Sequence, residues 1–171
     1  MNPMSRETLL GIRDGIQPVK RRDVPLAKEA GSKIYRKGKR FGIPMGNLLS
    51  CLNEAGRNFK FQRNKTIGTA DASLIPAFTE FHDDFFPFLG KAKWDVDVRH
   101  GRNKDGSANC IVRPKFSGWS IKVNFSFDDK QGVSVETMKK LFEWAGRAIG
   151  LGSFRKKSFF GRFRVKSWKA K

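Results

Sequence analysis

Residues 119–150 read WSIKVNFSFDDKQGVSVETMKKLFEWAGRAIG, a strand pattern followed directly by a helix pattern. Up to Phe127, apolar and aromatic side chains alternate with polar ones, which is typical of a strand with one buried face. Ser134 then precedes apolar side chains that recur every three or four residues, and serine is a favoured helix cap. We therefore expect a strand over 119–127 and a helix that ends at Gly150. The helix would bury Met138, Leu141, Phe142, Ala145, Ala148 and Ile149.

Two further strand patterns precede this one. Residues 94–100 alternate strictly between apolar and polar side chains, so we expect a strand with one buried face, followed by a turn over 103–106. Residues 110–116 form the other pattern and are separated from Trp119 only by Ser117 and Gly118. Such a short glycine-containing connection predicts a tight hairpin between 110–116 and 119–127.

The first helix is predicted over 44–56. Pro44 suits a first helical turn, and Gly56 suits the carboxyl end. Leu48, Leu52 and Ala55 recur on one face between them. Ahead of it, residues 7–19 contain a weak candidate strand, whose apolar members are Leu9, Leu10, Ile12 and Ile16, closed by Pro18.

These elements follow one another as strand, helix, strand, strand, helix and strand. That order predicts an α+β fold with a ferredoxin-like βαββαβ antiparallel sheet and two helices. We expect a single domain over residues 1–171, with an exposed basic loop over 20–40 and a glycine-rich loop over 150–161. Residues 58–92, rich in phenylalanine, are interpreted as a long irregular insertion after the first helix.

The composition favours a polyanionic partner. Lys and Arg number 35 against 16 Asp and Glu, which gives a formal net charge of +19. A surface this positive repels itself unless a polyanion such as RNA or DNA neutralises it. No apolar run approaches the roughly 20 residues that span a bilayer, and residues 1–13 lack a secretory pattern. Cys51 and Cys110 lie in apolar patterns, so we expect buried free thiols and a cytoplasmic protein without a membrane partner.

The strongest functional pattern is the glycine-rich loop and the segment after it. Glycine lets a backbone approach a ligand closely, while cations between aromatic rings offer phosphate attraction and stacking surfaces together. We expect Phe159 or Phe160 to stack on a base, and of the two we include Phe160 among the candidate binding residues. Candidate nucleic-acid-binding residues in this region are Gly150, Gly152, Arg155, Lys156, Lys157, Phe160, Gly161, Arg162, Arg164, Lys166 and Trp168.

Two other basic clusters are candidates for contact with phosphates, without reading of base sequence. The basic loop contributes Lys20, Arg21, Arg22, Lys37, Lys39 and Arg40, together with Lys33 and Arg36. The residues that follow the first helix contribute Arg57, Lys60, Arg63 and Lys65.

The two histidines are the only conventional general bases. Cleavage of RNA through its 2′-hydroxyl needs a base and a cation, which His100 with Arg99 and Arg102 could supply. His82 is flanked by Asp83 and Asp84, and no second cluster of metal ligands accompanies them. We therefore expect no catalytic residue, no metal and no other cofactor, and His100 and His82 are kept for an enzymatic alternative.

Three features together resemble the RAMP superfamily, the RNA-binding proteins of CRISPR effector complexes and their relatives. They are the sequence GIPMGNLL at residues 42–49, which is similar to the family's IPGSSLKG helix start, the element order, and the glycine-rich loop at 150–163. They cover about half of the chain, and its small size is similar to that of short phage-encoded relatives. The resemblance implies single-stranded RNA held across the sheet and the glycine-rich loop. It also implies assembly with CRISPR effector subunits, or of copies of this chain along RNA.

The sequence therefore predicts a non-catalytic protein that binds single-stranded RNA within a ribonucleoprotein, without a small-molecule substrate. One alternative is a metal-independent endoribonuclease of the CRISPR-processing type. Another is a single-stranded-DNA-binding or ribosome-associated structural protein.

Overall fold

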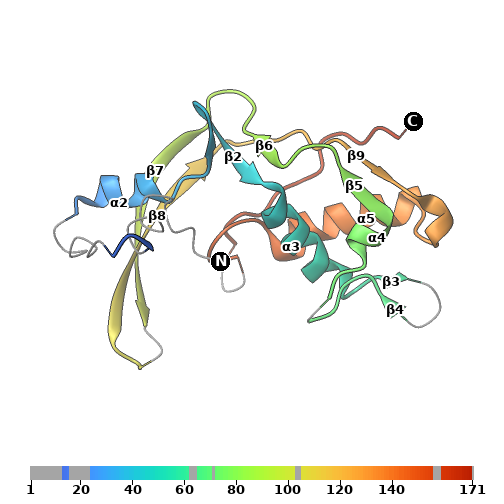
Figure 1. The fold of residues 1–171 in the computed structure, drawn as a ribbon, viewed down its shortest axis with the longest axis horizontal. Coiled ribbons are helices and arrows are strands. Elements are labelled where there is room, and N and C mark those ends of the chain that lie inside the picture. Colours follow the sequence, from blue (N-terminus) through green and yellow to red (C-terminus); the bar gives the residue numbers. More distant parts are fainter. Residues whose placement is uncertain are drawn as a thin grey trace. The chain divides into compact units, whose positions relative to one another are not determined.

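The computed structural model describes residues 13–15, 24–61, 65–70, 72–102, 105–155 and 159–170, and its fold is mixed α+β with antiparallel sheets (Figure 1). The sequence predicted one domain, whereas the chain forms two compact units. We call Met1–Gly42 with Pro87–Ile121 the hairpin unit, and Ile43–Phe86 with Lys122–Lys171 the core unit. None of the described helices is long and apolar enough to cross a bilayer.

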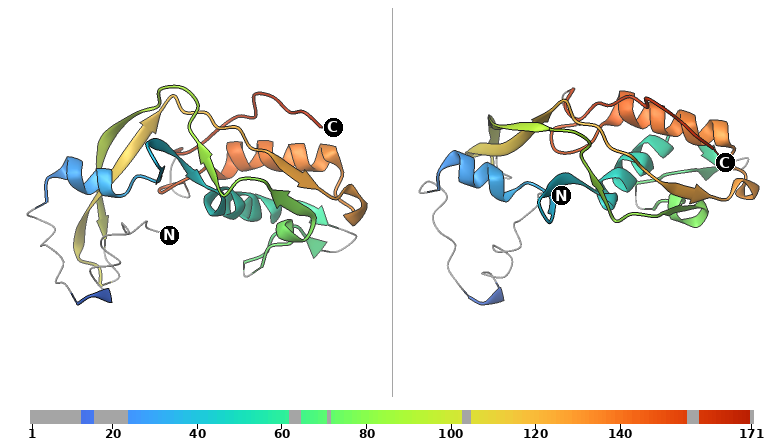
Figure 2. Two further views of the ribbon diagram at one scale, coloured as in Figure 1. Left: turned by 45° about the horizontal axis from the view of Figure 1, so that its top comes forward. Right: turned by 90° about the horizontal axis from the view of Figure 1, so that it is seen from above.

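The hairpin unit is built on one long antiparallel pair. Strand β7 (Lys93–Arg102) pairs with β8 (Ala108–Ser117) over ten residue pairs. The two strands lie side by side in Figures 1 and 2. Helix α2 (Leu26–Ser32) packs on β8 and buries Ala30 and Val112. Just after this helix, Lys33 Nζ donates to the Val112 carbonyl over 2.9 Å.

The predicted hairpin between 110–116 and 119–127 is wrong, because β8 pairs with the preceding strand β7. The register of β8 with β7 gives ten residue pairs on either side of the turn near Asp105 and Gly106. It is stabilised by more cross-strand side-chain pairs than a hairpin limited to residues 110–116 could form. After Gly118, the Leu89 amide donates to the Ser120 carbonyl over 2.8 Å. Trp119 packs 6.0 Å from the Phe88 ring, so the chain turns away from β8 here.

The strand predicted over 94–100 is confirmed, but its predicted buried face is wrong. Val96 is 37% exposed and Val98 is 48% exposed. A two-stranded pair covered by one short helix buries only part of its apolar face, and this explains the exposed valines.

The basic segment before the first long helix is not a loop where it is described. Helix α2 lies in it, and β1 (Arg36–Lys37) pairs with β2 (Arg40–Pro44) around Gly38, which has a φ of +61°. Strand β6 (Phe85–Pro87) completes a three-stranded sheet in the order β1-β2-β6. The strand predicted over 7–19 lies outside the described residues, apart from 13–15.

Two helices form the centre of the core unit. Helix α3 (Met45–Gly56) confirms the predicted first helix, with Leu48, Leu52 and Ala55 buried. Helix α5 (Val135–Trp144) begins at Ser134, whose Oγ accepts the Thr137 amide over 3.2 Å. The two helices lie side by side (Figure 2).

The predicted second helix extends to Gly150, but its last turn is π-helical (η3, Ala145–Ile149). Gly146 in this turn lies directly against Phe163, whose amide donates to the Gly146 carbonyl over 3.2 Å. A π-helical turn is a frequent feature of functional sites, and periodicity alone did not indicate it.

A cluster of aromatic rings packs beside these helices. Strand β5 (Thr79–Phe81) pairs antiparallel with β9 (Phe125–Phe127), which places Phe81 opposite Phe125. Phe125 stacks on Phe142 of α5 at 5.2 Å and contacts Trp168 at 5.7 Å. The predicted alternation over 121–127 is confirmed in burial, although only its last three residues form a paired strand.

Residues 58–92 are not one irregular insertion, since β5 and β6 belong to the sheets described above. The remaining elements are short: β3 (Lys60–Phe61) pairs with β4 (Lys65–Thr66), and α4 (Ile75–Phe78) follows. Phe78 and Phe86 are buried, in agreement with the predicted packing by phenylalanines.

The strand predicted at the carboxyl end does not form in the described residues 162–170. Phe163 and Val165 are half-buried while Arg164 and Lys166 are exposed, so the segment alternates without a paired neighbour.

The two cysteines should differ in reactivity. Cys51 is fully buried, and burial raises the pKa of its thiol to about 12. Cys110 is exposed, which contradicts the prediction of burial. A thiol reagent at neutral pH should therefore modify Cys110 in the folded protein and Cys51 only after unfolding, as peptide mapping by mass spectrometry can measure. Modification of Cys51 in a folded Cys110→Ser variant would contradict this assignment.

Candidate nucleic-acid interface

The glycine-rich loop is closed by backbone contacts at its base. Gly150 ends the π-helical turn with a φ of +81°, and the Leu151 amide donates to the Gly161 carbonyl over 2.9 Å. Gly161 has a φ of +70°, and a Cβ there would overlap the Leu151 backbone. Glycine is therefore required at this crossing both by conformation and by space.

Within the loop, Phe154 adopts a φ of +61°, the one positive value at a non-glycine residue in the described ranges. Bulky residues rarely adopt this conformation, which costs roughly 1–2 kcal/mol and so indicates a loop fixed by its surroundings. Arg155 follows and donates to the Gly152 carbonyl over 3.2 Å. It also forms an ion pair with Glu54 of α3 at 3.3 Å.

This ion pair changes the role of Arg155. Both partners are largely buried, with side chains 24% and 22% exposed. The predicted phosphate contact thus becomes a tie between the loop and α3, because the guanidinium charge is already matched. Lys156 and Lys157 lie outside the described residues.

The cations after the loop differ in exposure. Arg164 and Lys166 are exposed. Arg162 is half-buried, and its Nε and Nη1 atoms are buried without a hydrogen-bond partner in the described structure. Of the described cations after the loop, Arg164 and Lys166 are therefore better placed than Arg162 to meet a phosphate.

The aromatic candidates are placed differently from the prediction. Phe160 is half-buried, whereas Phe159 is 91% exposed. Trp168 packs edge-on against Phe142 at 5.5 Å and against Phe125, so it belongs to the core and is not a free stacking surface. Its predicted place beside Arg164 assumed a regular strand, and the alternation stops at Ser167.

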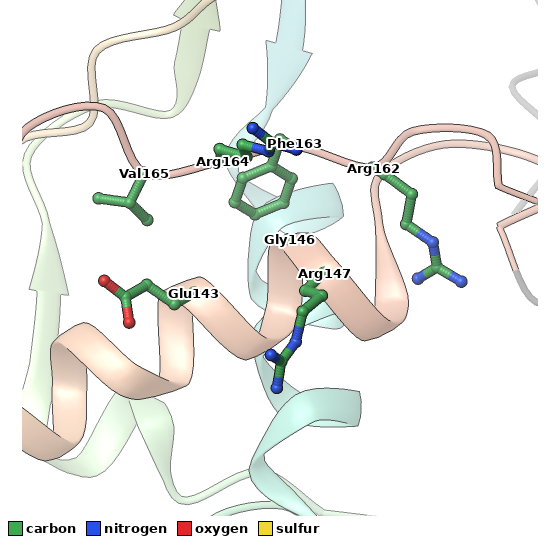
Figure 3. A pocket seen from close by; sticks show the side chains of 7 residues that line it. All are labelled: Glu143, Gly146, Arg147, Arg162, Phe163, Arg164 and Val165. Carbon is green, nitrogen blue, oxygen red and sulfur yellow. The ribbon is translucent and has the colours of Figure 1, made fainter.

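A hollow of about 520 Å³ lies between the end of α5 and the segment after the loop (Figure 3). Phe163 points from that segment toward Gly146, and Arg147 stacks on the Trp144 ring at 5.1 Å. Figure 3 shows the Arg147, Arg162 and Arg164 side chains pointing in different directions. Three arginines and one acid, Glu143, line the hollow, and the three guanidinium groups do not converge on one point. The lining residues are Glu143, Gly146, Arg147, Arg162, Phe163, Arg164 and Val165.

The basic loop residues are partly exposed and partly engaged. Lys37, Lys39 and Arg40 are exposed, and Arg36 lies over the Phe41 ring at 5.2 Å. Lys33 is paired with Glu29 at 2.5 Å, so it is not available to phosphate. Lys20, Arg21 and Arg22 lie outside the described residues.

The cluster after the first helix is exposed where it is described. Arg57, Lys60 and Lys65 are all on the surface of the core unit, the latter two on the paired strands β3 and β4. Arg63 lies outside the described residues.

Both histidines of the enzymatic alternative lie in described parts of the chain. His100 is exposed and lies opposite Cys110 in the ladder, with the exposed Arg102 on the same face of β7. Arg99 points to the other face and bonds Asp97 at 2.6 Å. His82 lies with its Nε2 atom 2.6 Å from the Ser126 hydroxyl. The parts of the chain that the structure describes contain no group of three or more metal-binding side chains.

The sequence did not show that Phe159, rather than Phe160, is the exposed aromatic ring of the loop. Two adjacent phenylalanines in an irregular loop carry no periodicity, so the sequence cannot tell which ring faces outward. Arg147 was also missed, since it lies in a helix read only for its apolar face.

No family model, curated protein or solved structure matches this chain.

The loop closure can be tested by two matched glycine substitutions. Gly152 has a φ of +84° with open space around it, so Gly152→Ala should cost about 1 kcal/mol of unfolding free energy through conformation alone. Gly161→Ala should cost about 3 kcal/mol or more, because the Leu151 crossing must also open. Chemical denaturation measures both, and equal losses would show that the crossing does not hold the loop.

Proposed function

We propose that this chain is a non-catalytic protein that binds single-stranded RNA through the phosphates of the strand. Its contacts would be the exposed cations after the glycine-rich loop and the exposed clusters on each unit. The observation that carries the proposal is the composition of residues 150–171, which contain eight Lys or Arg residues and no Asp or Glu.

The geometry of the loop supports this function. The Leu151–Gly161 crossing and the Arg155–Glu54 pair fix the base of the loop on the helices of the core unit. Arg164 and Lys166 follow at once and are exposed. A fixed backbone with outward cations loses little conformational entropy on meeting a phosphate chain, which favours binding.

We also infer that the core unit is a diverged ferredoxin-like domain of the RAMP type. The order α3, β5, β9, α5 and then the basic carboxyl-terminal segment supports this inference, with β5 and β9 paired antiparallel. The hairpin formed by β7 and β8 would then be an insertion between two core strands. Such a domain would bind RNA within a ribonucleoprotein. Its protein partners would be CRISPR effector subunits or further copies of this chain.

The proposed place of action is the cytoplasm. Cys51 and Cys110 form no disulfide in the structure, which supports a reducing compartment, where disulfides are rare.

A salt titration of RNA affinity tests the phosphate contacts. Each phosphate neutralised on a single strand contributes about 0.7 to the slope of log affinity against log salt. The double variant Arg164→Gln with Lys166→Gln should therefore lower that slope by about 1.4, as fluorescence anisotropy with a labelled single-stranded RNA would measure.

The matched control is Lys139→Gln with Lys140→Gln on α5. These lysines are also exposed, but they pair with Glu143 at 3.9 Å and Glu136 at 2.7 Å. The control removes the same charge and should leave the slope nearly unchanged. Equal effects of the two double variants would show that only net charge matters. Stronger binding of duplex or single-stranded DNA would favour the other nucleic-acid-binding class. RNA cleavage that is lost when both His100 and His82 are replaced by alanine would favour the enzyme.

A further inference from the structure

Phe159 is the most exposed large apolar side chain in the described ranges. It is 91% exposed, while the next, Leu26, is 51% exposed. A phenylalanine ring gains considerable free energy when it is removed from water, so a fully exposed ring in a basic loop suggests a ligand.

The loop keeps this ring outside the core unit. Phe160 is half-buried, and Gly161 immediately after it is fixed at the crossing with Leu151. Phe160 is partly covered by the protein whereas Phe159 is not, so the two adjacent rings have different surroundings. The ring is thus held near a fixed anchor and away from the protein.

The charge around Phe159 decides which partner fits. The segment contains no acid, and the whole chain has a formal net charge of +19, so a second copy of this chain would bring strong repulsion. A nucleobase is an aromatic surface attached to an anionic chain. The base can stack on the Phe159 ring while the phosphates attract the cations of the segment.

We propose that Phe159 stacks on a nucleobase of the bound strand, and that it thereby favours unpaired strands over duplex. This inference rests on the proposed function. Bases in a duplex are already stacked on one another, so only an unpaired or extruded base offers its face to the ring.

The test compares two strands of equal length and charge: a single-stranded oligoadenylate and the same strand with abasic sites in place of bases. Phe159→Ala should weaken binding of oligoadenylate by about 5- to 150-fold and have little effect on the abasic strand. Phe159→Trp should keep the affinity for oligoadenylate, whereas Phe159→Leu should behave like Phe159→Ala. Leu89→Ala, at a residue that is 49% exposed, is the control for loss of an exposed apolar side chain.

Each outcome separates this inference from the proposed function. If the wild-type protein binds both strands and Phe159→Ala has no effect, or an equal effect on both, stacking is overturned while RNA binding stands. If Phe159→Ala abolishes only self-association, the ring is a protein contact and stacking is again overturned. If the wild-type protein binds neither strand, the proposed function fails and this inference fails with it. Since the ring is exposed, an unchanged melting temperature verifies that each variant is folded.

Discussion

An excess of positive charge without internal compensation is the constraint on which this structure depends. Several of the described acids form ion pairs of their own, among them Glu54 with Arg155, Asp97 with Arg99, and Glu136 with Lys140. In the last of these, the hydrogen bond from Lys140 lowers the pKa of Glu136 and keeps the carboxylate charged. With 35 Lys and Arg against 16 Asp and Glu, the acids cannot neutralise the basic clusters, and an external polyanion would supply the missing negative charge.

The same pairs show how charge and fold are connected. The Arg155–Glu54 pair joins the glycine-rich loop to α3, and the buried Cys51 thiol donates to the Ala145 carbonyl over 3.6 Å at the start of the π-helical turn. Phe163 then fills the space left by the absent side chain of Gly146. Loop, helices and carboxyl-terminal segment are thus one connected arrangement, on which Phe159, Arg164 and Lys166 are exposed.

Local signals in the sequence predicted the helices well. Ser134 as a cap and the apolar spacing of α3 depend on residues within one or two turns, so α3 and α5 were found with nearly correct limits. The predicted strand pairing was wrong, because pairing depends on contacts that a local pattern does not contain. The alternation at 110–116 is compatible with pairing to the preceding strand or to the following one. The structure pairs it with the preceding strand, β7, over ten residue pairs. The π-helical turn was missed because it arises from the close contact of Gly146 with Phe163.

For the site, composition located the region but not the role of each side chain. The acid-free stretch was visible in the sequence. The pairing of Arg155 with Glu54 and the packing of Trp168 on Phe142 were not, because both contacts join residues that are far apart in the chain.

The most direct measurement of the central claim is whether nucleic acid accompanies the native protein. Protein purified in dilute buffer should show an absorbance ratio raised by bound nucleic acid, and ribonuclease but not deoxyribonuclease should remove it. A ratio typical of protein alone, at the lowest salt that keeps the chain in solution, would contradict the account.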